Sequence, residues 1–383
     1  MRNKSNNKTM HGNAFDTHRR IFLKNGILCG MAGMLAGPTL PSLAAINTSK
    51  EHTKRRLRPV LDENWWLIGP APKQGSHNIP VKMGEHGEIR PYESVDHHIF
   101  RAGDGYWHLW GCVRHTGWGR ILYHWKARNL SDSPWEDTGE FIRANEAFGE
   151  SINGWGNEEW IQSPFFVKAN DLYYMFYGGH STGRNGEGSP SRGKTRNDSF
   201  DTECQICIMT SPDGLHWSRH AYADGLSRAF TGPGEARDPC LIKIKGLWHL
   251  YYTGLEDGDP RKGGIFVRTS TDLLHWSAYE LVHRAGQYGS NWWEIECPQV
   301  VYREGYFYLF RTRNYTEAIT YVFRSDDPLD FGRNDESAKR KFVCQVPCAA
   351  TEIYQVEGEE YVSSNHNPAL GTQMCRLRWQ SES

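Results

Sequence analysis

The sequence predicts an all-β fold, a five-bladed β-propeller, because one pattern occurs five times. In each copy a polar or acidic residue opens a short apolar strand, a tight polar turn follows, and an aromatic-rich strand comes after the turn. The copies begin at Asp96, Ser163, Asp238, Glu296 and Glu352. Their spacing of 56 to 75 residues leaves room for about four strands each, as in propeller blades. No stretch has the period of an amphipathic helix. A lectin-like β-sandwich is the alternative, but it does not predict five copies of one pattern.

Each copy is expected to form a hairpin, because its two strands are joined by a short turn rich in Gly, Asn and Asp. In chain order the paired segments are 96–100 with 106–110, 163–167 with 173–177, 238–242 with 247–252, 296–301 with 306–310, and a degenerate 352–356 with 361–362. A further strand follows in the first three copies and ends near Trp135, Trp217 and Trp276; residues 321–327 are an abbreviated version in the fourth. The segment 57–68 is expected to close the ring onto the last blade.

Residues 1–45 differ in composition from the rest and are predicted to be a bacterial twin-arginine export signal. They contain the pair Arg19-Arg20, an apolar run over 26–40 and the small-residue end Ser42-Leu43-Ala44-Ala45. A membrane anchor is the alternative, but this run of roughly 15 residues, rich in Gly and Ala, is short for a span of about 20. We therefore expect a periplasmic or secreted protein without a membrane span, in which residues 46–383 form a single catalytic propeller domain.

The composition excludes several partners and sites. The 383 residues include 44 basic and 45 acidic ones, a net charge of −1, so nucleic acid is not an expected partner. Cys204 and Cys207 have the spacing of metal ligands, but no matching second pair follows and the next residues read as a strand. We therefore expect buried thiols at these positions. The oligomeric state is left open.

Candidate catalytic residues come from the repeat starts, because the first strand of each propeller blade lines the central channel. Four of the five starts are acidic, and Asp96, Asp238 and Glu296 are the candidates. Capping of strand ends is the alternative for any one of them. Crowded carboxylates raise one another's pKa, and such crowding is typical of active sites. Glu294 shares strand parity with Glu296, but Glu296 is favoured because it aligns with Asp238 in the repeat.

Two motifs resemble those of the five-bladed β-propeller glycoside hydrolases, which include invertase-like, arabinan- and xylan-debranching, and neoagarooligosaccharide-cleaving enzymes. Arg237-Asp238-Pro239 looks like the invertase-like RDP motif, and Glu296-Cys297-Pro298 is similar to its EC(P) motif. The resemblance covers roughly residues 90 to 365. The first-blade motif departs from the invertase-like Asn-Asp-Pro-Asn-Gly type, because Glu93 to His98 stand there. A fructose substrate is therefore not implied, and Glu93 stays an alternative to Asp96.

The resemblance implies a glycosidase with three carboxyl roles. Glu296 is expected to be the general acid, because the nearby tryptophans would desolvate it and raise its pKa. Asp96 is expected to be the nucleophile of a retaining enzyme or the base of an inverting one, and Asp238 to orient the sugar and modulate the pKa of Glu296. Carboxyls about 5 Å apart favour retention, and about 6.5 to 9.5 Å favour inversion. The missing first motif leads us to expect inversion.

The expected substrate is an oligosaccharide or polysaccharide, since aromatic rings stack on sugar C–H faces while charged groups bind the hydroxyls. No cofactor is expected to be required. His366 resembles a last-blade histidine of arabinan-cleaving relatives, which implies a possible structural divalent cation in the channel. A non-catalytic sugar-binding propeller, or a transglycosylase or phosphorylase, are the alternative functions. The expected substrate-binding residues are His97, Trp160, Gln162, Arg237, Trp292, Trp293 and Arg311.

Overall fold

The computed structural model describes residues 54–150, 158–180, 204–234, 236–256, 261–284, 286–289 and 291–382. These residues belong to one compact unit. The predicted export signal lies outside the described residues, so export remains a prediction. No helix in the described ranges has the length and apolar character needed to cross a membrane.

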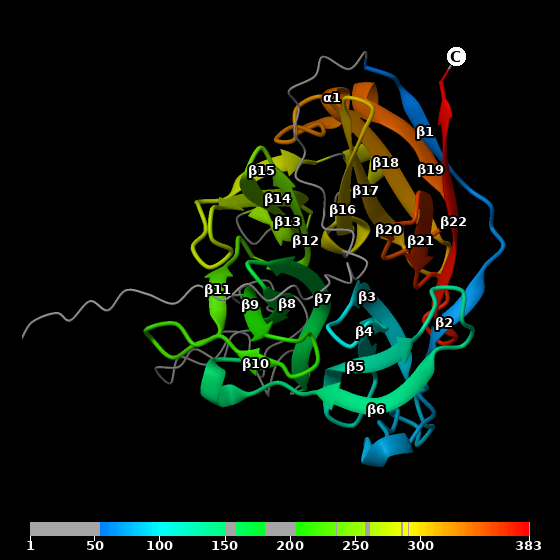
Figure 1. The fold of residues 1–383 in the computed structure, drawn as a ribbon, viewed down its shortest axis with the longest axis vertical. Coiled ribbons are helices and arrows are strands. Elements are labelled where there is room, and N and C mark those ends of the chain that lie inside the picture. Colours follow the sequence, from blue (N-terminus) through cyan, green and yellow to red (C-terminus); the bar gives the residue numbers. More distant parts are fainter. Residues whose placement is uncertain are drawn as a thin grey trace, which may run out of the picture. The chain divides into compact units, whose positions relative to one another are not determined.

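The described strands form five blades (Figure 1). Blade 1 contains β3 (Glu93–Arg101), β4 (Trp107–Arg114), β5 (Gly119–Ala127) and β6 (Glu136–Ile142). Blade 2 contains β7 (Glu159–Ala169), β8 (Leu172–His180) and β9 (Cys204–Ser211), with β10 (Ser218–Arg219) and β11 (Arg228–Thr231) beside β9. Blade 3 contains β12 (Ala236–Ile244), β13 (Leu247–Leu255), β14 (Gly263–Ser270) and β15 (Glu280–His283). Blade 4 contains β16 (Glu296–Arg303), β17 (Tyr306–Asn314), β18 (Ile319–Ser325) and β19 (Phe342–Val346).

Blade 5 contains β20 (Glu352–Val356), β21 (Glu359–Ser364) and β22 (Gly371–Ser381), joined by β1 (Leu57–Leu61) and β2 (Trp66–Pro70). The α-helix of the described part is α1 (Asp335–Lys341), before β19. The short 3-10 helices are η1 (Ser76–Asn78), η2 (Glu146–Phe148), η5 (Gly286–Tyr288) and η6 (Trp292–Glu294).

The first strands of the blades form a closed ring. β3 lies against β7, β7 against β12, β12 against β16, and β16 against β20. The ring returns to its start where the Ile99 amide of β3 donates to the Tyr354 hydroxyl of β20 at 3.0 Å. The predicted five-bladed β-propeller is thereby confirmed. Blades 1 and 2 share one sheet because β5 and β7 also pair in parallel over two residues.

Strands from the two ends of the described chain close the ring of blades. β1 pairs antiparallel with β22, with Leu57 opposite Ser381 and Leu61 opposite Leu377, and β2 pairs with β22 further along. The segment that was expected to close the ring therefore does so. The Leu57 and Leu61 side chains are buried in a cluster that includes Tyr308 of blade 4, so the closure is hydrophobic as well as hydrogen-bonded.

The aromatic residues of the repeat pack between the blades. Trp217 contacts Phe100 and Phe166, and Trp276, at the equivalent outer turn, contacts Phe176 and Phe230. These tryptophans are therefore structural. All eight described cysteines are free and buried, which confirms the expectation for Cys204 and Cys207.

Candidate active site

A β-bulge shapes the inner strand of each of the first four blades. The pairing register shifts in β3, β7, β12 and β16, and each bulge contains a non-glycine residue with positive φ: Asp96 (42°), Ser163 (55°), Asp238 (58°) and Cys297 (50°). In blade 5, Ala350 (48°) precedes β20. Left-handed backbone is unfavourable for such residues and is often found at functional sites. All five line one pocket, together with His97, Pro164, Pro239, Pro298 and Glu352.

The positions of the bulges correct the expected alignment of Glu296 with Asp238. Glu296 pairs with Thr312 immediately before the bulge of β16, as Arg237 pairs with Thr253 before the bulge of β12. Glu296 is therefore equivalent to Arg237, and Cys297 is equivalent to Asp238. The sequence contains a signal for this equivalence, because Pro239 and Pro298 directly follow Asp238 and Cys297.

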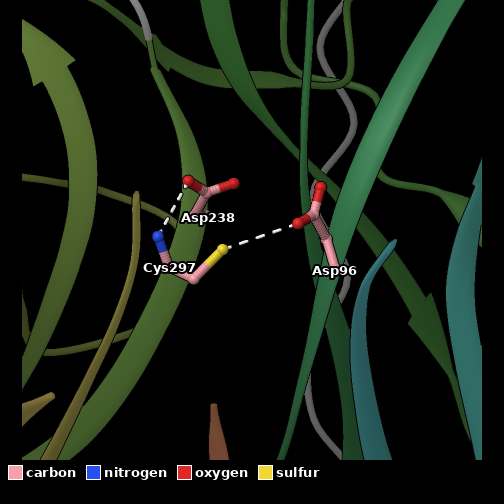
Figure 2. A group of neighbouring side chains, drawn as sticks. All are labelled: Asp96, Asp238 and Cys297. Carbon is pink, nitrogen blue, oxygen red and sulfur yellow. Dashed lines mark hydrogen bonds between the residues drawn. The ribbon is translucent and has the colours of Figure 1, made fainter. Parts of the chain in front are cut away.

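Asp96 and Asp238 lie close together in the pocket, with Cys297 beside them (Figure 2). The Cys297 thiol is 3.5 Å from Asp96 Oδ1, and the Cys297 amide donates to Asp238 Oδ2 at 3.1 Å. The Tyr315 hydroxyl also donates to Asp96 Oδ1. Ser163 lies between the two carboxyls, with its Oγ within hydrogen-bond distance of both.

Asp238 is held by more groups than Asp96. In addition to the Cys297 amide, its Oδ2 accepts from Thr253 Oγ1 at 2.8 Å, and the Arg237 Nε lies 3.5 Å away. Burial raises the pKa of Asp238; Arg237 offsets part of this rise and the charge of Asp96 adds to it. Asp238 is therefore biased toward its neutral form.

Glu296 reaches the same site through Arg237. The Arg237 Nη2 donates to Glu296 Oε1 at 3.0 Å, and the Glu296 side chain is 17% exposed. Burial raises the pKa of Glu296 to about 7, which Arg237 lowers in part and Asp238 and Asp96 raise further. A carboxyl with this pKa carries a proton below neutral pH and can donate it.

Three of the expected substrate-binding residues lie next to the carboxyls of Asp96, Asp238 and Glu296. Arg237 bridges Glu296 and Asp238, as above. Gln162 directly precedes Ser163, and its Oε1 accepts from Arg120. The Arg120 guanidinium lies 4.1 Å from the centroid of the Trp160 ring, which is half-buried. Arg120 thus joins Trp160 and Gln162 into one unit beside the bulge of β7.

The tryptophans before Glu296 are only partly described. Trp293 is 46% exposed, as a sugar-stacking residue must be. Trp292 begins η6, but its side chain lies outside the described part of the structure.

The structure does not support the substrate contact expected of Arg311. Its side chain is fully buried and donates to the carbonyls of Glu294 at 2.6 Å and Tyr288 at 2.7 Å, and to His283 Nε2 at 3.1 Å. Burial lowers the pKa of Arg311 to about 9. Arg311 instead anchors the segment that precedes Glu296, because its position opposite the bulge of β16 points it under η6 rather than into the pocket.

His97 contributes to the pocket wall, but both of its ring nitrogens are engaged with blade 5. Nδ1 contacts Asn365 Oδ1, and Nε2 lies 2.5 Å from Ser363 Oγ. Burial lowers the pKa of His97 to about 4, so the ring is neutral at neutral pH. The direct substrate contact expected of His97 is therefore replaced by a link between blades 1 and 5.

The geometry around His366 does not fit a cation site. Its Nδ1 lies 2.9 Å from Ser364 Oγ, its Nε2 lies 3.2 Å from Gln373, and its ring packs on Trp65. Within the described ranges, no group of three His, Cys, Asp or Glu ligand atoms includes His366. The cluster of Asp96, Asp238 and Cys297 is compact, but its carboxylate oxygens already accept hydroxyl and amide hydrogens. We therefore assign no metal ligand in either place.

Two groups that touch the carboxyls, Tyr315 and Thr253, were not predicted from the sequence. Tyr315 lies in the turn between β17 and β18, 219 residues from Asp96, and Thr253 lies 15 residues from Asp238. Neither occurs in a motif. Ser163 did stand at a repeat start, and its position among four acidic starts was the one signal for it.

No family model matches the chain. No curated protein matches its sequence. Among solved structures the chain is similar to the Bombyx mori GH32 beta-fructofuranosidase BmSUC1, with a TM-score of 0.52 and 16% identity over 85% of this chain and 62% of that one. A mutant of the same Bombyx mori enzyme in complex with sucrose has a TM-score of 0.50 and 15% identity over 82% and 62% of the two chains. A thermostable family-43 glycoside hydrolase has a TM-score of 0.50 and 14% identity over 76% and 93%.

These likenesses confirm the resemblance in fold to the five-bladed β-propeller glycoside hydrolases of families 32 and 43. The chain spans 62% of the length of the Bombyx mori enzyme. At such low identity the likeness establishes the fold, and activity has to be argued from the site.

Proposed function

We propose that this protein is an exported glycosidase that hydrolyses a glycosidic bond in an oligosaccharide or polysaccharide. The observation that carries the proposal is the buried Glu296 carboxyl, whose pKa is raised to about 7 and which Arg237 links to the carboxyl pair Asp96 and Asp238. Glycoside hydrolysis needs two carboxyls of this kind, one protonated and one ionised. The similar Bombyx mori enzyme is a beta-fructofuranosidase with a sucrose complex, which supports a sugar substrate.

In the proposed mechanism Glu296 protonates the leaving glycosidic oxygen. Asp96 activates a water molecule on the opposite face of the sugar, or attacks the anomeric carbon itself if the enzyme is retaining. Asp238 binds a hydroxyl of the same sugar, and Arg237 keeps the pKa of Glu296 near neutrality rather than higher. Inversion remains our prediction for the stereochemistry.

Sugar binding is assigned to the residues beside the bulges. Trp160, held by Arg120, offers an indole face, and the exposed Trp293 offers a second one before Glu296. Gln162 accepts from Arg120 through Oε1, which leaves its amide hydrogens for a sugar hydroxyl. No step above requires a metal ion.

The test is a panel of oligosaccharides, polysaccharides and aryl glycosides, with the anomer of each product read by NMR. We expect hydrolysis by the unaltered protein, and loss of hydrolysis in Glu296→Gln and Asp96→Asn. Glu304→Gln, in the exposed turn at the other end of the same hairpin, is the matched control. Oligosaccharide hydrolysis that persists unchanged in Glu296→Gln contradicts the proposal. Sugar binding without turnover would indicate a non-catalytic propeller, and product formed only with phosphate would indicate a phosphorylase.

A further inference from the structure

Ser163 lies between the two aspartates of the site. Its Oγ is 2.7 Å from Asp238 Oδ1 and 3.1 Å from Asp96 Oδ2, and the residue is 4% exposed. The bulge of β7 gives Ser163 a φ of 55°, which places it on the same ring as the two aspartates. Ser163 is thus the blade 2 counterpart of Asp96 and Asp238.

The Ser163 hydroxyl cannot donate to both aspartates at once. A serine hydroxyl has one hydrogen and donates to one carboxylate at a time. If both aspartates were ionised, one of the two contacts would set a hydroxyl lone pair against a carboxylate lone pair in a buried pocket, which is repulsive. Both contacts are hydrogen bonds only when one carboxyl carries a hydrogen and donates it to Oγ.

The remaining contacts restrict where this hydrogen is bound. Asp238 Oδ2 accepts from Thr253 and the Cys297 amide, and Asp96 Oδ1 accepts from Tyr315. The hydrogen is therefore on one of the two oxygens that face Ser163. The shorter contact, at 2.7 Å, is the one to Asp238. Burial also raises the pKa of Asp238, which favours this carboxyl as the one that holds the hydrogen.

We propose that Ser163 is a positioning residue through which Asp96 and Asp238 share a single proton, a proposal that rests on the glycosidase function above. Asp238 Oδ1–H donates to Ser163 Oγ, and Ser163 Oγ–H donates to Asp96 Oδ2. Asp238 is then neutral, and Asp96 keeps its negative charge without a second anion beside it. Asp96 is thereby kept in the ionised form that either version of the mechanism needs.

Other titratable groups face Asp96 and Asp238, and their ionisation has to be distinguished from that of the aspartate pair. Burial raises the pKa values of Glu296, Cys297, Tyr315 and Glu352, so these four are neutral at mildly acidic pH. The cations are Arg237, next to Asp238, and Arg114, whose charge acts on Asp96. His97 also faces Asp96, and burial lowers the pKa of His97 to about 4, within the acidic range. An experiment that tests the proposal must therefore either detect aspartate carboxyls alone or measure the effect of removing the Ser163 hydroxyl.

The first test compares kcat/KM against pH for the unaltered protein, Ser163→Ala and Ser163→Gly. A bridge that stabilises the singly protonated pair separates its two apparent pKa values, so its loss brings them together. We expect the acidic limb to move up by about one pH unit and kcat/KM to fall about 10- to 100-fold, as for a hydrogen bond to a charged group. Glycine fits the positive φ without strain, so agreement between the two variants excludes a backbone effect.

Ser211 provides the matched control. Its hydroxyl donates to Asp213 Oδ1 at 2.8 Å in an outer turn, which is the same chemical pair outside the channel. Ser211→Ala should keep the acidic limb of the unaltered protein. An unchanged acidic limb in both Ser163 variants would overturn the proposal.

The second test needs no substrate. Infrared spectra of protein labelled with 13C in the aspartate carboxyls should contain the band of a protonated aspartate at neutral pH. The band should be absent in Asp238→Asn and should titrate at a lower pH in Ser163→Gly. If the unaltered protein has no such band, proton sharing is wrong whatever the hydrolysis assays give. If the band behaves as expected but no glycoside is hydrolysed, the proposed function fails and the shared proton stands.

Discussion

Replacing Glu296 with glutamine isolates the contribution of its proton. Burial raises the pKa of this carboxyl from 4.5 to about 7. At pH 6 an acid with a pKa of about 7 is roughly 90% protonated, whereas one with an ordinary pKa is roughly 3% protonated. The site therefore supplies about 30-fold more general acid at pH 6 than an exposed glutamate would.

The sign of the pH dependence follows from the raised pKa. The protonated form is the active one, so activity is lost as the pH rises through about 7. Glu296→Gln has nothing to ionise, and the basic limb of its kcat/KM profile should disappear. The level of kcat/KM should fall by about 10²- to 10⁴-fold, the usual contribution of a general acid. The fall should be much smaller for an aryl glycoside, because its phenolate leaves without a proton.

The assay measures kcat/KM between about pH 4 and 9 with an alkyl and an aryl glycoside of the sugar that the substrate panel identifies. Glu304→Gln is measured in parallel and should match the unaltered protein. A basic limb near pH 7 in Glu296→Gln, or an equal loss of activity on the alkyl and the aryl glycoside, would refute the role of Glu296 as general acid.

Three further predictions concern positioning, closure and metal. Tyr315→Phe removes the hydroxyl that donates to Asp96, and kcat should fall about 10- to 100-fold with little change in KM. The control is Tyr279→Phe, at an exposed position, which should have no effect. An equal kcat in both variants would contradict the positioning of Asp96 by Tyr315. Leu57→Ala should lower the free energy of unfolding by about 2 to 4 kcal/mol in urea, unlike the exposed Gln380→Ala on β22; an unchanged midpoint would mean that β1 does not stabilise the closed ring. Incubation with EDTA should leave activity and the unfolding temperature unchanged, whereas a loss that calcium reverses would require a cation in the protein.

The blades could be predicted because their information is local. A strand, its turn and its hairpin partner lie within about 20 residues, so alternating apolar residues and turn residues are visible in the sequence. The acidic repeat starts were visible for the same reason. The roles of Arg311 and His97 were not, because a side chain's direction beside a bulge depends on a backbone conformation that the hydrophobic pattern does not encode.

By itself the sequence determined the repeat, the closing segment and the two aspartates, Asp96 and Asp238, that line the pocket. Only the tertiary structure decided which atoms meet. Asp96 contacts Tyr315 across 219 residues, and Ser163 reaches two aspartates that are 67 and 75 residues away. Such contacts arise because the ring brings equivalent positions of separate blades together, while a bulge in each of the first four inner strands turns one side chain toward the others. Burial then follows from the same packing, and burial is what raises the pKa of Glu296 to about 7.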